Sequence, residues 1–201
     1  MARPVYGTGA SMRLLRGILE RTPAPEGQHT AGSGDGGSLF PVRYRQRLVA
    51  ELKLDAATAR SLMRALLDAC RGSDECAQIA CLQDFADGFR RMALIKSVQF
   101  YPYLRCALEH DTMAMMHFNE VQAETQRHVL RIEAILVEYL GAPWDATCRR
   151  RFVSDVARAA SLLGRLLRQE ESTLFPLYLP PDQYRYLGGP RTRESGGPAA
   201  G

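Results

Sequence analysis

A nine-residue pattern occurs twice in the chain and constrains its fold more than any other feature. The first copy starts at Lys96 and reads Lys-Ser-Val-Gln-Phe-Tyr-Pro-Tyr-Leu, and the second starts at Glu170 and reads Glu-Glu-Ser-Thr-Leu-Phe-Pro-Leu-Tyr. In both copies a charged residue stands six positions before a proline that aromatic residues flank. An apolar residue, Met92 or Leu166, lies four positions before each charge. This repeat indicates two equivalent helix ends within one helical bundle.

The long segments between the chain ends have the apolar spacing of amphipathic helices. Four apolar stripes follow one another: Leu48, Leu52, Leu62 and Leu66; Phe85, Phe89, Met92 and Phe100; Val121, Ile132, Ile135 and Tyr139; Phe152, Val156, Leu163, Leu166, Leu167 and Leu174. No alternating strand pattern competes with them. We therefore predict an all-α fold, an antiparallel up-and-down four-helix bundle over residues 39–186. The first helix is predicted to end near Cys70, with Gly72 as a left-handed C-terminal cap.

The two ends of the chain have a different composition. Residues 1–38 are predicted to be a flexible tail, because residues 32–38 are rich in glycine and serine. The basic stretch from Met12 to Arg21 within it is interpreted either as a short helix leaning on the bundle or as a membrane-surface anchor. Residues 187–201 are predicted to be a disordered C-terminal tail.

Charge, cysteine count and hydropathy limit the classes of function. The formal net charge is +4 and the arginines are scattered among acidic residues, so we expect no nucleic-acid partner. The five cysteines include no Cys-x-x-Cys pair, which argues against a disulfide framework and a zinc site. The sequence has no apolar run long enough for a transmembrane segment and no signal peptide, so a cytoplasmic location is the expectation.

Several polar residues fall on the apolar stripes. When the stripes are continued at helical spacing, Lys96 joins the second, Thr125 and His128 the third, and Glu170 the fourth, while Asp55 interrupts the first. A buried unpaired charge costs several kcal/mol. Our hypothesis is that Lys96 and Glu170 form a buried pair, with Asp55 and His128 as further members of the network. The alternative is loosely packed helix ends from which both charges reach solvent.

At these positions the chain resembles the hemerythrin-like family, whose members are four-helix bundles with a carboxylate-bridged di-iron centre. That family has a histidine on the first helix, often after an aspartate, and another on the third. Its second and fourth helices carry His-x-x-x-Glu followed by a proline turn. The resemblance covers about residues 42–180. It rests on three segments: Leu52-Lys-Leu-Asp55, Phe100-Tyr-Pro-Tyr-Leu and Arg168-Gln-Glu-Glu-Ser-Thr-Leu-Phe-Pro-Leu-Tyr.

The resemblance does not extend to the metal ligands. The positions where the family has histidines carry other residues here: Ala56, Met92, Thr125 or a neighbour, and Leu166; the one imidazole nearby, His128, lies one turn further along. Lys96 stands at the second-helix glutamate, where its ammonium repels a cation, and only Glu170 matches a ligand. The resemblance thus implies a metal-free member without a cofactor, in which a side-chain charge replaces the charge of the metal.

Three hypotheses for the function follow. The leading one is a non-enzymatic interaction or regulatory module whose partner is another protein or a second copy of the chain. The first alternative is an iron- or oxygen-binding protein with a rearranged ligand set of Asp55, Glu124, His128 and Glu170. The second alternative is a regulator that binds the RNA polymerase sigma subunit, because residues 82–101 are faintly similar to the second-helix region of such regulators.

One further segment is relevant to partners. The methionine-rich stretch Thr112-Met-Ala-Met-Met-His is interpreted as core packing at a helix start, with a soft, adaptable contact surface as the alternative.

Overall fold

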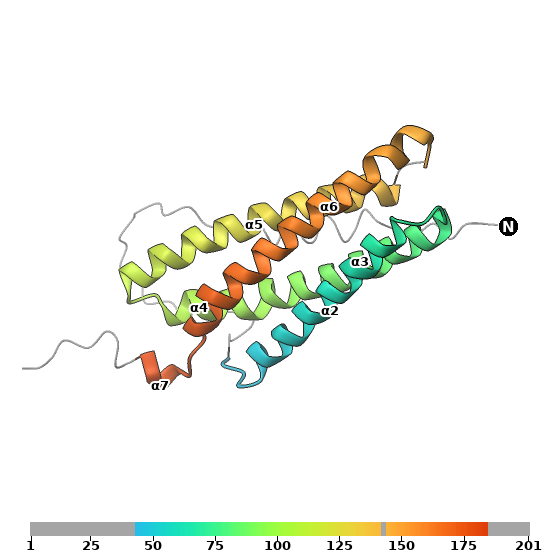
Figure 1. Ribbon diagram of the computed structural model, residues 1–201. Helices are drawn as coiled ribbons and strands as arrows, with labels where there is room; N and C mark the ends of the chain where they lie inside the picture. Colours follow the sequence, from blue (N-terminus) through green and yellow to red (C-terminus); the bar gives the residue numbers. More distant parts are fainter. Residues whose placement is uncertain (1–42, 142–143, 185–201) are drawn as a thin grey trace, which may run out of the picture.

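The computed structural model describes residues 43–141 and 144–184 (Figure 1). These two ranges form helices and their connections and contain no strand, which confirms the all-α prediction. The α-helices are α2 (Leu48–Ala69), α3 (Glu75–Ile95), α4 (Tyr101–Ala107), α5 (Thr112–Gly141), α6 (Ala146–Gln169) and α7 (Pro181–Tyr184). Two π-helical turns, Lys96–Phe100 and Glu170–Leu174, and a 3-10 turn, Phe175–Leu177, complete the elements. The predicted tails, residues 1–38 and 187–201, lie outside the described residues.

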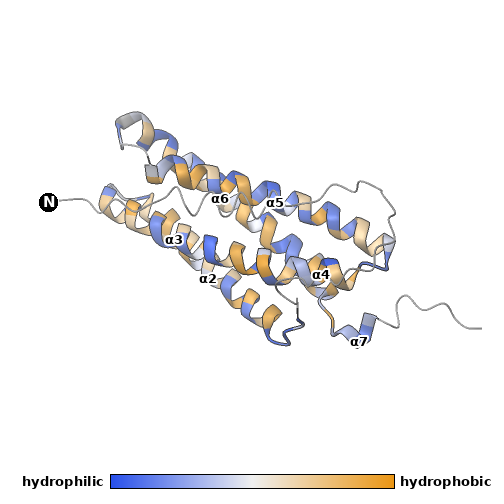
Figure 2. Cartoon of the chain, turned by 180° about the vertical axis from the view of Figure 1, so that it is seen from behind, coloured by the Kyte–Doolittle hydropathy of each residue, from blue (hydrophilic) through white to orange (hydrophobic). Residues whose placement is uncertain are grey.

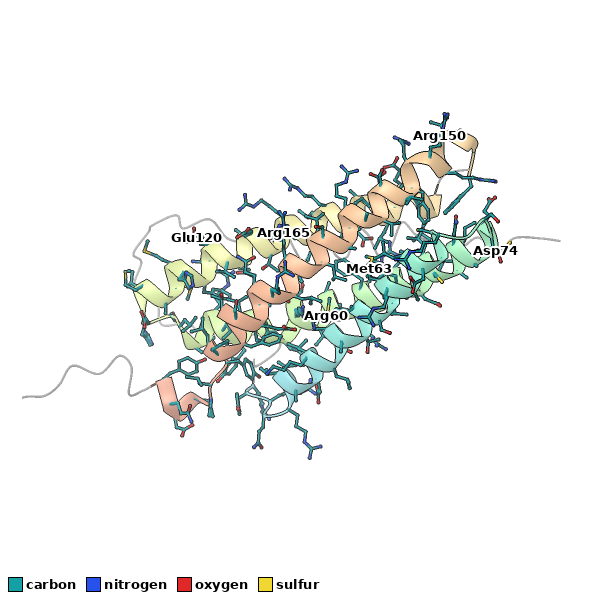
Figure 3. The ribbon with its side chains drawn as sticks, viewed as in Figure 1. Arg60, Met63, Asp74, Glu120, Arg150 and Arg165 are labelled. Atoms are coloured by element: carbon teal, nitrogen blue, oxygen red, sulfur yellow. The ribbon has the colours of Figure 1, made fainter. Side chains whose placement is uncertain are left out.

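The four long helices, α2, α3, α5 and α6, run lengthwise beside one another (Figure 1). α2 packs against α3 and α6, and α5 packs against α6 and α3. Hydrophilic and hydrophobic residues are mixed along each of them, as expected of amphipathic helices (Figure 2). Exposed charged residues such as Glu120 on α5 and Arg165 on α6 project outward (Figure 3). Among the described residues, no helix is both long and apolar enough to cross a membrane.

Aspartate side chains cap the first turns of three helices. Asp74 accepts hydrogen bonds from two backbone amides at the start of α3, and Figure 3 shows it at that end of the helix. Asp145 accepts one from Cys148 at the start of α6, and Asp111 accepts one from Ala114 at the start of α5. These carboxylates satisfy amides that have no acceptor within the helix, so they fix where each helix begins.

The prediction of a left-handed cap at Gly72 is wrong. α2 ends at Ala69, close to the predicted position, but no glycine of the described residues has a positive φ. The chain instead continues in a turn, in which the Gly72 amide donates to the Ala69 carbonyl at 3.1 Å. The buried side chain of Gln78 then donates to the carbonyls of Ala69 and Gly72. Because a side chain from the next helix satisfies these carbonyls, the left-handed cap is not needed.

Buried apolar side chains form two clusters along the long axis. The first joins the second half of α2 to α3, α5 and α6, and it includes Ala56, Phe85, Met92, Ile132, Phe152 and Leu166. The second lies toward the start of α2, around α4 and the turns that follow α6 (together the fourth helical segment). It includes Leu52, Phe100, Phe118, Val121, Leu174 and Phe175. The polar residues of the stripes fall between members of the two clusters, so a polar layer separates them.

The methionine-rich start of α5 packs in the core only in part: Ala114 and Met115 are partly buried against the second cluster, whereas two other methionines are not. Met113 and Met116 are 74% and 62% exposed. The buried face of α5 begins with Phe118 and continues through Val121 and Thr125, and helical spacing places the two methionines off that face. The exposure of these two methionines agrees with the alternative interpretation, a contact surface.

Candidate functional site

Each copy of the repeated pattern contains a π-helical turn that begins at its charged residue. In the first copy the Tyr101 amide donates to the carbonyl of Lys96, and in the second the Phe175 amide donates to the carbonyl of Glu170. A proline follows in both copies; it has no amide hydrogen, and its ring clashes with the carbonyl four residues earlier in a regular α-helix. A wider turn relieves that clash. Such π turns are frequent at functional sites.

The two charged residues that begin these turns are in contact. Lys96 Nζ lies 2.5 Å from Glu170 Oε2, and the side chains are only 3% and 1% exposed. The Tyr101 hydroxyl donates to the other carboxylate oxygen, Oε1, also at 2.5 Å. The geometry is the one that the sequence hypothesis described for Lys96 and Glu170. The tyrosine adds a third member that the hypothesis did not include.

Burial and a neighbouring charge keep the Tyr101 hydroxyl protonated. Burial raises the pKa of Tyr101 well above its ordinary value, and the negative charge of Glu170 and the hydrogen bond to it raise that pKa further. The phenol therefore remains a donor at any physiological pH. The carboxylate holds one charged and one neutral donor, which satisfies both of its oxygens in the interior.

Aromatic residues of the two repeat copies hold the cluster from one side. The Phe100 ring meets the Phe175 ring edge-on, with centroids 5.4 Å apart, and stacks on the Tyr178 ring at 5.6 Å. Such ring pairs contribute about 0.5–1.5 kcal/mol beyond the area that they bury. The two helix ends that carry Lys96 and Glu170 are thus fixed relative to each other by their own flanking aromatics.

The remaining predicted site residues do not join the pair. Asp55 lies toward Arg91 at the surface, with 3.7 Å between Oδ1 and the guanidinium. Glu124 Oε2 accepts a hydrogen bond from Gln169 at 2.6 Å. His128 is buried, and its Nδ1 has no hydrogen-bond partner among the described residues. Its pKa is lowered, chiefly by burial, although the nearby Glu124 acts in the opposite direction.

The side chains present do not fit a di-iron centre. Four buried residues occupy the places that the resemblance assigns to histidines: Ala56, Met92, Thr125 and Leu166. Alanine and leucine have no donor atom, and a thioether or a neutral hydroxyl is a poor substitute for imidazole. Glu170, the one matching carboxylate, has both oxygens occupied by Lys96 and Tyr101. Within residues 43–141 and 144–184, no three His, Cys, Asp or Glu side chains form a group that could hold a metal ion.

A pocket of about 510 Å³ opens beside the ion pair, between the α3–α4 segment and α5. Its deep wall contains Met92, Lys96, Leu166 and Glu170, together with Thr125 from α5. The most exposed of its lining residues are Cys106 and Glu109, which place its mouth at α4. Most of the lining surface is apolar.

The sequence did not reveal this pocket or the role of Tyr101. One signal for the tyrosine was available, because the residue before the proline is Tyr101 in the first copy and Phe175 in the second. Only the first copy therefore places a hydroxyl beside the charges. The pocket depends on how far α5 stands from α3 and α4, and that spacing has no local signature in the sequence.

Comparisons of the chain with protein-family models, with curated proteins and with solved structures found no match.

Proposed function

We propose that this chain is an antiparallel, up-and-down four-helix bundle of the hemerythrin-like type that has lost its di-iron site. In this proposal it acts as a non-enzymatic regulatory module that binds a protein partner. One observation carries the proposal: the only carboxylate that matches a family ligand, Glu170, is neutralised by Lys96 at 2.5 Å in the interior.

Three features support the bundle topology. The four long helices follow one another along the chain, and consecutive helices pack together, α2 with α3 and α5 with α6. Short connections such as residues 70–74 and 108–111 favour antiparallel neighbours. The two repeat copies meet through Phe100 and Phe175, as equivalent helix ends in one bundle should.

The ion pair takes over the structural role of the metal in this account. A metal centre in a bundle ties facing helices together through charged ligands, and here Lys96 on the second helical segment is tied to Glu170 on the fourth. A lysine held by a carboxylate is protonated and is no nucleophile. The proposal therefore assigns no catalytic role to the cluster.

The surface supports a protein partner. Met113 and Met116 expose flexible, polarisable side chains at the start of α5, a property of adaptable contact surfaces. The partner is either another protein or a second copy of the chain. All five cysteines are free thiols in the structure, which suits a reducing compartment such as the cytoplasm.

An iron titration of the purified chain tests the proposal. Ferrous iron is added without oxygen, air is then admitted, and the ultraviolet–visible spectrum and the unfolding temperature are recorded. We expect no oxo-bridge absorption band and no rise in the unfolding temperature, because a ligand that does not bind the folded chain cannot stabilise it. Saturable binding with an oxo-bridge band would support the rearranged ligand set of Asp55, Glu124, His128 and Glu170 instead.

Self-association is tested separately by sedimentation velocity. If the partner is a second copy, the wild-type chain should dimerise with rising concentration and the double variant Met113→Lys/Met116→Lys should stay monomeric. Dimerisation that both chains share equally would remove the methionine surface from the proposal.

A further inference from the structure

The pocket beside the ion pair has the size and lining of a small-molecule site. Ligand pockets in proteins have volumes of about 300–1,000 Å³ and mostly apolar walls with a few polar groups. This pocket has about 510 Å³, and the buried side chains of Phe89, Met92 and Leu166 supply apolar wall. Its apolar lining fits the body of an organic molecule better than it fits a string of water molecules.

The deep wall contains two groups with unused capacity to donate hydrogen bonds, the Thr125 hydroxyl and the Lys96 ammonium. Thr125 lines the pocket, is 1% exposed, and its Oγ1 has no hydrogen-bond partner in the described part of the chain. Lys96 also lines it, and an ammonium carries three donors. Within residues 43–141 and 144–184, this ammonium makes one hydrogen bond, to Glu170. A buried polar group without a partner costs about 1–3 kcal/mol, so an acceptor that reaches both donors would be stabilised there.

Charge selects among the possible acceptors. Lys96 and Glu170 neutralise each other, so a carboxylate in the deep pocket would bring a second negative charge without a compensating cation. At the mouth, Arg105 and Glu109 carry opposite charges and give no net preference. A neutral acceptor avoids the cost of burying an extra charge.

We propose that this pocket binds an uncharged small molecule with an apolar body and one carbonyl-type acceptor, whose oxygen accepts hydrogen bonds from Thr125 and Lys96. The inference rests on the proposed function in one respect, namely that the pocket floor is the ion pair and not a metal centre. It adds a ligand class to that function, because the bound molecule would contact the same ion pair that joins the second and fourth helical segments.

Three probes of similar size separate the effects of a carbonyl oxygen and of a negative charge on binding. They are butyrophenone, which has a ketone oxygen; butylbenzene, which has none; and 4-phenylbutyrate, which is anionic. Each is titrated into the full chain labelled at the methionine methyl groups and followed by nuclear magnetic resonance. Met92 and Met115 line the pocket, whereas Met63 and Met113 do not, so binding should shift the first two signals and leave the others unchanged.

We expect butyrophenone to bind about tenfold more tightly than butylbenzene and 4-phenylbutyrate, a factor equivalent to about 1.4 kcal/mol. Thr125→Val keeps the shape of the side chain and removes the hydroxyl. Because Lys96 can still donate to the ketone oxygen, this variant should reduce the preference for the ketone over butylbenzene severalfold and leave butylbenzene affinity unchanged. Thr58→Val is the matched control, because Thr58 is exposed on α2 and does not line the pocket. Ala93→Leu, which adds volume at the pocket wall, should weaken all three probes.

Two results would overturn the inference: no probe shifts Met92 and Met115, or the ketone preference is as large in Thr125→Val as in the wild-type chain. Tighter binding of 4-phenylbutyrate than of butyrophenone would also overturn it, since the charge argument would then fail. The iron titration distinguishes these failures from failure of the proposed function. If the chain binds neither iron nor any probe, the proposed metal-free function stands and the pocket ligand is ruled out. If the chain binds iron, the metal-free function is ruled out, whatever the probes show.

Discussion

Substituting Lys96 by methionine should destabilise the chain by about 3–5 kcal/mol, the typical cost of breaking a buried ion pair by removing one partner. The size of the effect follows from the surroundings of Glu170. That residue is 0% exposed, and without the ammonium its carboxylate retains only the Tyr101 hydroxyl as a donor. Domains are typically stable by about 5–15 kcal/mol, so this loss would be a large fraction of the total.

The double variant Lys96→Met/Glu170→Met should recover most of the lost stability. Replacing both members of a buried pair by apolar residues of similar volume is often neutral or stabilising. One cost remains, because the Tyr101 hydroxyl loses its acceptor in the interior, and this cost is about 1–3 kcal/mol. The losses of the single variants are thus not additive, and the double-mutant cycle measures the coupling directly.

Urea unfolding followed by circular dichroism measures these free energies. The matched control is Arg151→Met, which breaks the exposed pair with Glu138, whose side chains are 60% and 44% exposed. Exposed pairs contribute about 0–1 kcal/mol, so the control should lie close to wild type. A loss for Lys96→Met as small as that of the control would show that no buried pair exists and would refute the reasoning.

Three further results are expected. Tyr101→Phe should lower the free energy of unfolding by about 1.5–3 kcal/mol in the same urea assay, because a hydrogen bond to a charged group is lost; an unchanged value would remove the tyrosine from the cluster. Burial lowers the pKa of His128 in the folded chain below its ordinary 6.5, so the unfolded chain binds more protons, and stability should fall as the pH drops below 6.5. The stability of His128→Gln should fall less over the same pH range. If the stability of the variant and of the wild-type chain fell equally with pH, the lowered pKa of His128 would not be the cause. Asp74→Ala should lower the free energy of unfolding by about 1 kcal/mol in the urea assay, because the α3 cap is lost. Asp74→Ser, which can still cap the helix, should keep most of that stability.

The helical class was predictable because apolar side chains recur at helical spacing over long segments. The same spacing located Lys96 and Glu170, since continuing a stripe of buried residues identifies the polar side chains that share its face. The cost of a buried charge then favoured a contact between them, with loosely packed helix ends as the alternative. Both steps use local pattern and simple electrostatics, which a single sequence contains.

Other features depend on relations between distant elements. The cap at Gly72 was mispredicted because Gln78, on the next helix, supplies the hydrogen bonds that a left-handed glycine would otherwise provide. The exposed Met113 and Met116 were mispredicted because hydrophobic type alone does not tell where the buried face of α5 begins. The pocket could not be predicted because its volume depends on helix spacing.

A second buried polar contact also escaped prediction. The Tyr139 hydroxyl donates to Asp155 at 2.5 Å inside the first apolar cluster. Asp155 directly precedes Val156, a residue of the apolar stripe. Its position in the sequence therefore predicts a side chain at the edge of the apolar face, not one buried against a neighbouring helix. Its burial results from α5 packing against α6, and the spacing along one helix does not show which residues at the edge of its apolar face such a contact covers.

We propose that the Lys96–Glu170 pair replaces a metal centre of the hemerythrin-like type; the structure shows the pair itself, buried in the interior. The most direct test is the iron content of the full chain purified after expression in iron-supplemented medium, measured by elemental analysis. The account predicts far less than one iron per chain and no oxo-bridge absorption band. Stoichiometric iron, present in the chain as purified and accompanied by that band, would contradict it.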